Sequence, residues 1–99
     1  MLRHVVSWKL KAEDVAAKAE DSARISAALQ TLPAVIPEIR SLTVGSNAAY
    51  PETNWDLVLI ADYDDAAALD VYQNHPEHRK VVAIIEPLVA ARANVDFLI

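Results

Sequence analysis

The chain begins with a regular alternation of apolar and polar positions. Every second side chain from residue 4 points to one side and is aromatic or large, and the set is His4, Val6, Trp8 and Leu10. This period of two predicts a β-strand. From residue 12 to residue 32 the apolar positions instead recur every three or four residues, which predicts a helix, and Pro33 marks its exit.

Two further strands are predicted next. Pro37 precedes an apolar run at residues 39–44, and the only glycine, Gly45, begins a polar loop that lasts to residue 54. Residues 55–63 carry apolar side chains on both faces. We therefore expect this third strand to be covered on both sides.

The second half of the chain predicts two helices and a last strand. Asp64 or Asp65 can cap a helix that ends near residue 74, because a carboxylate accepts the free NH groups of a first turn. Pro76 starts another helix, which runs to residue 88 with Pro87 near its end or at a kink. Residues 95–99 are apolar and are expected to close the fold as a strand.

The predicted order is therefore β α β β α α β. Helices occur only between strands one and two and between strands three and four, which is a split βαβ arrangement. The fold class is α+β, with one four-stranded, mainly antiparallel sheet and helices on a single face. The other sheet face would expose Val5, Val58 and Ile60 to water. We therefore expect a homodimer that packs two such open sheet faces together.

Composition narrows the function classes. The 99 residues make one domain, residues 1–99. A formal charge of −5 and the lack of a basic cluster argue against a nucleic-acid partner. Cysteine is absent, so disulfides and a thiolate nucleophile are excluded. Neither a signal peptide nor a membrane span is evident, and we expect a cytoplasmic protein without a membrane partner.

The chemically versatile residues gather at positions 72–78. This segment reads Tyr-Gln-Asn-His-Pro-Glu-His and holds two of the three histidines. Proline favours the first helical position and keeps the residue before it out of helical geometry, so His75 should cap a new helix with His78 in its first turn. Tyr72 lies at the end of the preceding helix. A phenol and an imidazole therefore converge on one corner of the fold.

Three segments of the chain resemble a known family. They are Arg3-His4-Val5-Val6 with Lys9 and Lys11, the run Tyr72-x-x-His75-Pro76-x-His78, and the closing Val95-Asp96-Phe97. In order and spacing they are similar to the stress-responsive dimeric α/β barrel domain family, often called Dabb. The resemblance covers the whole chain. It implies a ferredoxin-like protomer and a dimer whose facing sheets form an α+β barrel.

The resemblance also implies a site. One family member is a plant polyketide cyclase, which makes olivetolic acid and closes a linear polyketide by an aldol condensation without metal or cofactor. Its catalytic histidine and partner tyrosine match His78 and Tyr72 by position, and two further histidines match His4 and His75. A third-strand histidine of its cavity is replaced here by Leu57. We therefore expect His78 and Tyr72 to be catalytic and the reaction to need no cofactor. The expected substrate is a small apolar oxo compound, and the residues expected to bind it are His4, His75, Trp8, Leu57 and Leu59.

The chemistry of these residue types is compatible with catalytic roles and equally with purely structural ones. A helix N-terminus disfavours the imidazolium, so His78 should be neutral and able to accept a proton, while Tyr72 can polarise a carbonyl. Alternatively, Tyr72 is a core aromatic, and His75 is only a helix cap. His4 can equally be a buried histidine that is satisfied by Tyr72 or by a backbone carbonyl.

Two function classes remain. A metal site is not predicted. His75 caps the helix and so does not lie on the same helical turn as His78, and apart from His4 the sequence offers no obvious third ligand for a metal ion. The first class is a cofactor-independent enzyme or small-molecule binder with His78 as base and Tyr72 as acid. The second is a non-catalytic, stress-related assembly module with structural histidines. Small cofactor-free monooxygenases share the dimeric barrel, which is a likeness of fold alone. An open apolar pocket at Tyr72 and His78 would favour the first class.

Overall fold

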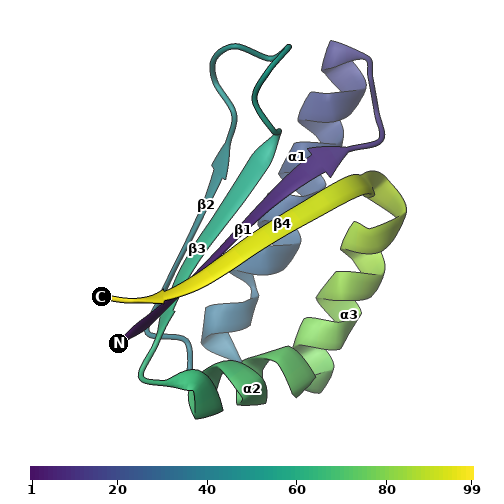
Figure 1. Cartoon of the computed structure of the whole chain (residues 1–99). Coiled ribbons are helices and arrows are strands. Elements are labelled where there is room, and N and C mark those ends of the chain that lie inside the picture. Colours follow the sequence, from purple (N-terminus) through teal and green to yellow (C-terminus); the bar gives the residue numbers. More distant parts are fainter.

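A computed structural model describes all 99 residues of the chain (Figure 1). Its seven main elements follow the predicted order β α β β α α β. They are β1 (Leu2–Leu10), α1 (Val15–Gln30), β2 (Ser41–Ser46), β3 (Leu57–Tyr63), α2 (Ala66–Asn74), α3 (Pro76–Ile85) and β4 (Val89–Leu98). Short 3₁₀ turns follow α1 at Leu32–Ala34 and α3 at Glu86–Leu88.

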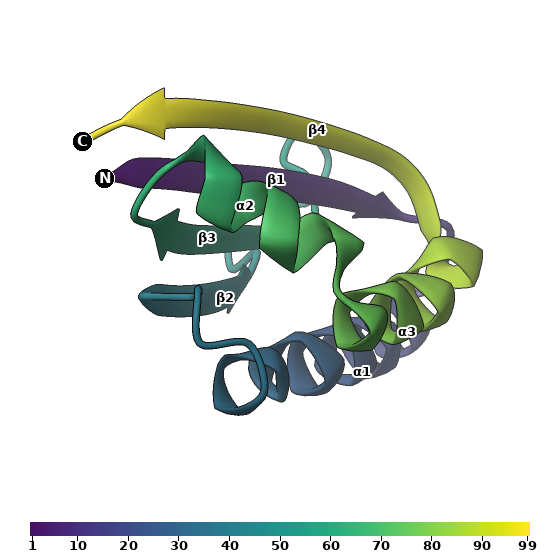
Figure 2. The same ribbon diagram turned by 90° about the horizontal axis from the view of Figure 1, so that it is seen from below.

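The four strands form one antiparallel sheet in the order β2-β3-β1-β4. The helices lie on one face of this sheet (Figures 1 and 2). The two chain ends lie side by side, where β1 begins and β4 ends. The fold is thus the predicted ferredoxin-like α+β protomer.

The core lies between the sheet and the helices. The alternation of β1 becomes an alternation of burial, because the side chains of His4, Val6, Trp8 and Leu10 are buried and those between them are not. Opposite them pack apolar residues of all three helices, namely Ile25, Leu29, Leu69, Tyr72, Val81 and Ile85. Burial of these side chains on one face fixes the register, since a slip by one residue would turn the set toward water.

The largest difference from prediction is the length of the last strand. The sequence predicts a strand at 95–99, whereas β4 runs from Val89 to Leu98. It pairs with β1 along its whole length, from Leu10 opposite Val89 to Leu2 opposite Leu98. The extra residues are rich in alanine, which has little intrinsic strand preference. The partner strand therefore determines the conformation of this segment.

Other boundaries move by a few residues. The first helix starts at Val15 instead of residue 12, because the Asp14 side chain accepts the Ala17 NH and caps the helix there. The second and third strands begin two residues later than predicted. The third helix ends at Ile85, and Pro87 lies in the 3₁₀ turn that follows.

Two predicted caps are present. Asp65 accepts the Ala68 NH at the start of α2, and the His75 ring accepts the Glu77 NH at the start of α3 at 3.1 Å. His75 has an extended backbone, the conformation that is favoured before a proline, and the chain turns there between α2 and α3. This turn places the end of one helix beside the first turn of the next.

The sheet face opposite the helices is apolar and open in the protomer. Val5 lies in register with Ile60 on one side and with Val95 on the other. Val95 is 63% exposed, and Phe97 on the same face is 44% exposed. In this protomer β3 is therefore fully covered on its inner face only. None of the helices is long and apolar enough to span a bilayer.

Candidate active site

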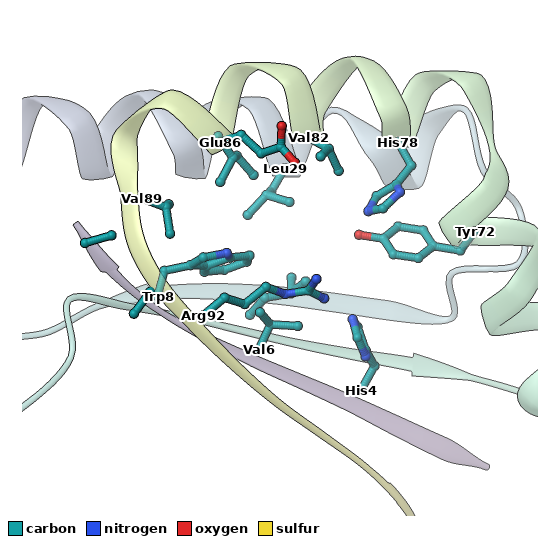
Figure 3. A pocket seen from close by; sticks show the side chains of 14 residues that line it. His4, Val6, Trp8, Leu29, Tyr72, His78, Val82, Glu86, Val89 and Arg92 are labelled. Atoms are coloured by element: carbon teal, nitrogen blue, oxygen red, sulfur yellow. The ribbon is translucent and has the colours of Figure 1, made fainter. Parts of the chain in front are cut away.

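A cavity of about 340 Å³ opens between the sheet and α3 (Figure 3). This volume is at the small end of the range for ligand sites, and ten of the 14 lining residues are hydrophobic. The floor is formed by β1 and β4 and the roof by α3 and the turn after it. The residues are His4, Val6, Trp8, Leu29, Leu59, Tyr72, His78, Val82, Ile85, Glu86, Val89, Ala90, Ala91 and Arg92.

The His78 ring is held by the end of α2. Its Nδ1–H donates to the carbonyl oxygen of Gln73 at 3.0 Å, because a carbonyl can only accept. This bond fixes the tautomer and leaves Nε2 with a free lone pair. Burial lowers the pKa of His78, while the bond to Gln73 opposes that change. A neutral imidazole with a free acceptor nitrogen is therefore present at the cavity wall.

The Tyr72 side chain lies against this ring. The two ring centroids are 4.3 Å apart, and the planes are inclined by 45°. Figure 3 shows the phenol oxygen pointing into the cavity, with His78 on one side and His4 on the other. Burial raises the pKa of Tyr72 to about 12, so the phenol keeps its proton at neutral pH. A hydrogen-bond donor and a proton acceptor thus face one space.

His4 is fixed by an acidic partner that the sequence did not reveal. Its side chain is 2% exposed, and Nδ1 lies 2.5 Å from Oδ1 of Asp96, the residue opposite it on β4. The expectation of Tyr72 or a backbone carbonyl as partner was wrong. Because a carboxylate accepts the Nδ1 proton, the other ring nitrogen is directed toward the cavity (Figure 3). The buried hydroxyl of Tyr63 forms no hydrogen bond of ordinary geometry, although the Tyr72 side chain is close enough to affect its pKa.

Five of the seven site residues expected from the sequence meet in this cavity, namely Tyr72, His78, His4, Trp8 and Leu59. The other two do not reach it. His75 is engaged as the cap of α3, and Leu57 is 3% exposed in the core, opposite Trp8 on β1. No group of three or more His, Asp or Glu side chains is placed to hold a metal ion.

Sequence reasoning missed the roof and one wall. Val82, Ile85 and Glu86 line the cavity from the His78 side of α3 and the turn after it, and their spacing of four, seven and eight residues from His78 is the signal that places them on one helix face. Arg92 and Asp96 share a strand face with period two. Arg92 was not foreseen because the last strand was predicted to begin at residue 95. Asp96 lies inside that predicted strand, but its place opposite His4 depends on the pairing of β4 with β1.

Several solved structures share this fold. A dimeric ferredoxin-like protein from Bacteroides fragilis NCTC 9343 is 30% identical, with a TM-score of 0.89 over 99% of this chain and 95% of that one. A dimeric ferredoxin-like protein from Thermobifida fusca YX is 32% identical, with a TM-score of 0.83 over 99% and 90%. Both are described as proteins of unknown function.

A hydroxynitrile lyase from Passiflora edulis is 14% identical, with a TM-score of 0.79 over 99% of this chain and 92% of that one, which shows the fold alone. A comparison with curated proteins found no match. Residues 2–99 match the model of the stress responsive A/B barrel domain, Dabb. The segments at both ends and the Tyr72–His78 run lie within that match, and the protomer has the ferredoxin-like fold of the two dimeric relatives. The chain therefore belongs to the stress responsive A/B barrel domain family.

Proposed function

We propose that this protein is a cofactor-independent acid–base enzyme, or a binder, for small apolar carbonyl compounds, with His78 as the base and Tyr72 as the acid. One observation carries the proposal: an open and mainly apolar cavity reaches both side chains. A filled core around the same residues would have favoured a purely structural role. The expected substrate is a small oxo compound, and His4, Trp8 and Leu59 would contact it.

The two side chains can divide one reaction between them. The free Nε2 of His78 accepts a proton from the carbon next to a ketone, and the electron pair moves to the ketone oxygen. The Tyr72 hydroxyl donates a hydrogen bond to that oxygen as its negative charge develops. The resulting enolate can attack a second carbonyl carbon of the same molecule, which closes a ring as the π bond of that carbonyl breaks. The alkoxide formed there takes the proton from His78, and the imidazole is neutral again. Positioned acid and base groups of this kind contribute about 10²- to 10⁴-fold in rate.

The environment of each group suits its role. Desolvation keeps His78 neutral, so that most molecules carry an active base at pH 7. The raised pKa keeps Tyr72 a donor. The Asp96 carboxylate holds His4 in one tautomer and orientation, and His4 in turn contributes to the floor below the phenol. That a hydroxynitrile lyase shares the fold shows that such a scaffold can carry an enzyme.

The test uses a β-triketone, heptane-2,4,6-trione, whose consumption is followed by ultraviolet absorbance and whose binding is followed by calorimetry. We expect His78→Ala and Tyr72→Phe to lower turnover by about 100-fold, or to abolish binding if the protein only binds. The matched control is His75→Asn, which removes an imidazole outside the cavity and keeps a capping side chain. Size-exclusion chromatography checks that every variant keeps the oligomeric state of the wild type.

The outcomes separate the two function classes. Unchanged turnover and binding in both site variants would refute the proposal, as would a failure of the triketone and related ketones to bind the wild type. A dimer that persists without any ligand binding would favour the non-catalytic assembly module. Loss of the dimer in the site variants would assign His78 and Tyr72 a structural role.

We further propose that the open sheet face is the homodimer interface. The support is the run of apolar residues across β1, β3 and β4, which are half-buried on β1 and β3 and exposed on β4, together with the dimeric description of both relatives. We expect Val95→Asp to yield a monomer in light scattering. Val15→Asp is the matched control, because Val15 is 83% exposed at the start of α1, away from this face. A Val95→Asp variant that remains fully dimeric would refute the interface.

A further inference from the structure

Arg92 is the one Lys or Arg side chain that lines the cavity. It lies on β4 directly opposite Trp8, on the sheet face that looks toward the helices. Figure 3 shows its side chain running over the floor, with the guanidinium directed toward the space between His4 and Tyr72. The residue is exposed. A fixed positive charge therefore stands at a solvent-accessible part of the wall of the proposed reaction site.

Arg92 forms no ion pair within the chain. Acidic residues outnumber basic ones by 14 to 9, yet the ion pairs use four other basic side chains, and Arg92 has no partner. Asp96, on the same face of β4, is bonded to His4. Glu86, the other charged lining residue, lies on the opposite wall in the turn after α3 and forms no ion pair with Arg92 (Figure 3).

The charge is within electrostatic reach of the acid–base pair. Burial has the largest effect on the pKa of both His78 and Tyr72, and beyond it the positive charge of Arg92 acts to lower each pKa. The rest of the lining is mainly hydrophobic. The cavity therefore presents an apolar surface with a donor and a base at one place and an unpaired cation beside them.

We propose that Arg92 makes the cavity selective for an anion: the substrate is an apolar oxo acid whose carboxylate pairs with Arg92 while its ketone lies at Tyr72 and His78. The guanidinium offers a planar fork of donors that matches a carboxylate. An apolar chain of the ligand would cover the hydrophobic lining. This inference rests on the proposed function and adds the charge of the substrate to it.

The test compares 4-, 5- and 6-oxodecanoate with their methyl esters, because each pair differs only in charge and the series varies the distance between carboxylate and ketone. Binding is measured by calorimetry at low salt. We expect the best acid to bind about tenfold more tightly than its ester, the size of one charge-assisted hydrogen bond. Arg92→Gln should lower the affinity for the acid to that for the ester, while the affinity for the ester should stay the same. Arg92→Lys should keep part of the preference for the acid.

Arg24→Gln is the matched control, since it removes the same charge from an exposed site on α1 outside the cavity. It should keep the preference for the acid. Equal binding of acid and ester by the wild type, with both weakened by Tyr72→Phe, would overturn the role of Arg92 and leave the proposed function standing. A preference that survives Arg92→Gln would also overturn it. Failure of every acid and ester to bind would overturn both.

Discussion

The contact between His4 and Asp96 offers a sharp test of how the cavity floor is held. Asp96→Ala removes the carboxylate that accepts the His4 Nδ1 proton. His4 is 2% exposed, so the imidazole would keep a polar NH in the core without its partner. We therefore expect the variant to be less stable and its cavity floor to be less ordered.

The size of the effect follows from the exposure of the two partners. Leaving a buried donor without an acceptor costs about 1–3 kcal/mol. The Asp96 side chain is 33% exposed, so water can enter where the carboxylate was and replace part of the bond. We expect a loss of about 1–2 kcal/mol in the free energy of unfolding, near the lower half of that range.

A double-mutant cycle isolates this bond from other effects of the substitution. His4→Phe removes the NH and keeps a ring against Tyr63 and Tyr72. In that background Asp96→Ala should cost less than about 0.5 kcal/mol. The free energies come from urea denaturation at one protomer concentration, because the stability of a dimer depends on concentration. An equal cost of Asp96→Ala in both backgrounds would refute the reasoning.

Three further predictions concern stability. Tyr63→Phe should change the free energy of unfolding by less than about 0.5 kcal/mol, or stabilise the protein, because the buried hydroxyl that it removes forms no hydrogen bond of ordinary geometry. A loss above about 1 kcal/mol in urea denaturation would show that this hydroxyl is bonded, with the neighbouring Tyr72 as its partner. Ile25→Ala should lower the free energy of unfolding by about 2–5 kcal/mol in the same assay, since Ile25 is fully buried in the core. A smaller loss would mean that neighbouring side chains move to fill the space left by the removed atoms. The pKa of His78 in the folded protein lies below its usual 6.5, so the unfolded chain binds more protons at this residue and the free energy of unfolding should fall as the pH drops below 6.5. His78→Gln should make the free energy of unfolding depend less on pH in that range. A pH dependence equal to that of the wild type would contradict the lowered pKa.

The sequence predicts the fold well because burial in this protein follows local patterns. The alternation of β1 places His4, Val6 and Trp8 on the inner face, and Pro76 with a capping His75 places the turn between α2 and α3. Each of these signals depends on residues a few positions apart. Sequence periodicity and capping chemistry report such relations directly.

The candidate site was predicted less completely, because its missing members depend on distant pairing. Arg92 lines the cavity and Asp96 bonds His4 only because β4 lies beside β1, and the alanine-rich segment that holds Arg92 has a weak strand preference of its own. The reverse error concerns Leu57. It has the same parity along β3 as Leu59 and lies opposite Trp8, but at that level the cavity is lined by residues of β1 and β4 and by none of β3.

The neighbouring position of the first and last strands has a consequence for synthesis and folding. His4 and Asp96 are separated by 92 positions in sequence, and the central strand is paired on one side with the segment of this domain that is made last. Contacts across such a separation are slow to form, because the chain loses the entropy of a long loop before they contribute. Until β4 is available, one edge of β1 stays unpaired and can attract other chains. The growing domain should therefore be most prone to aggregation just before its last ten residues emerge, and its cavity is the last part to become complete.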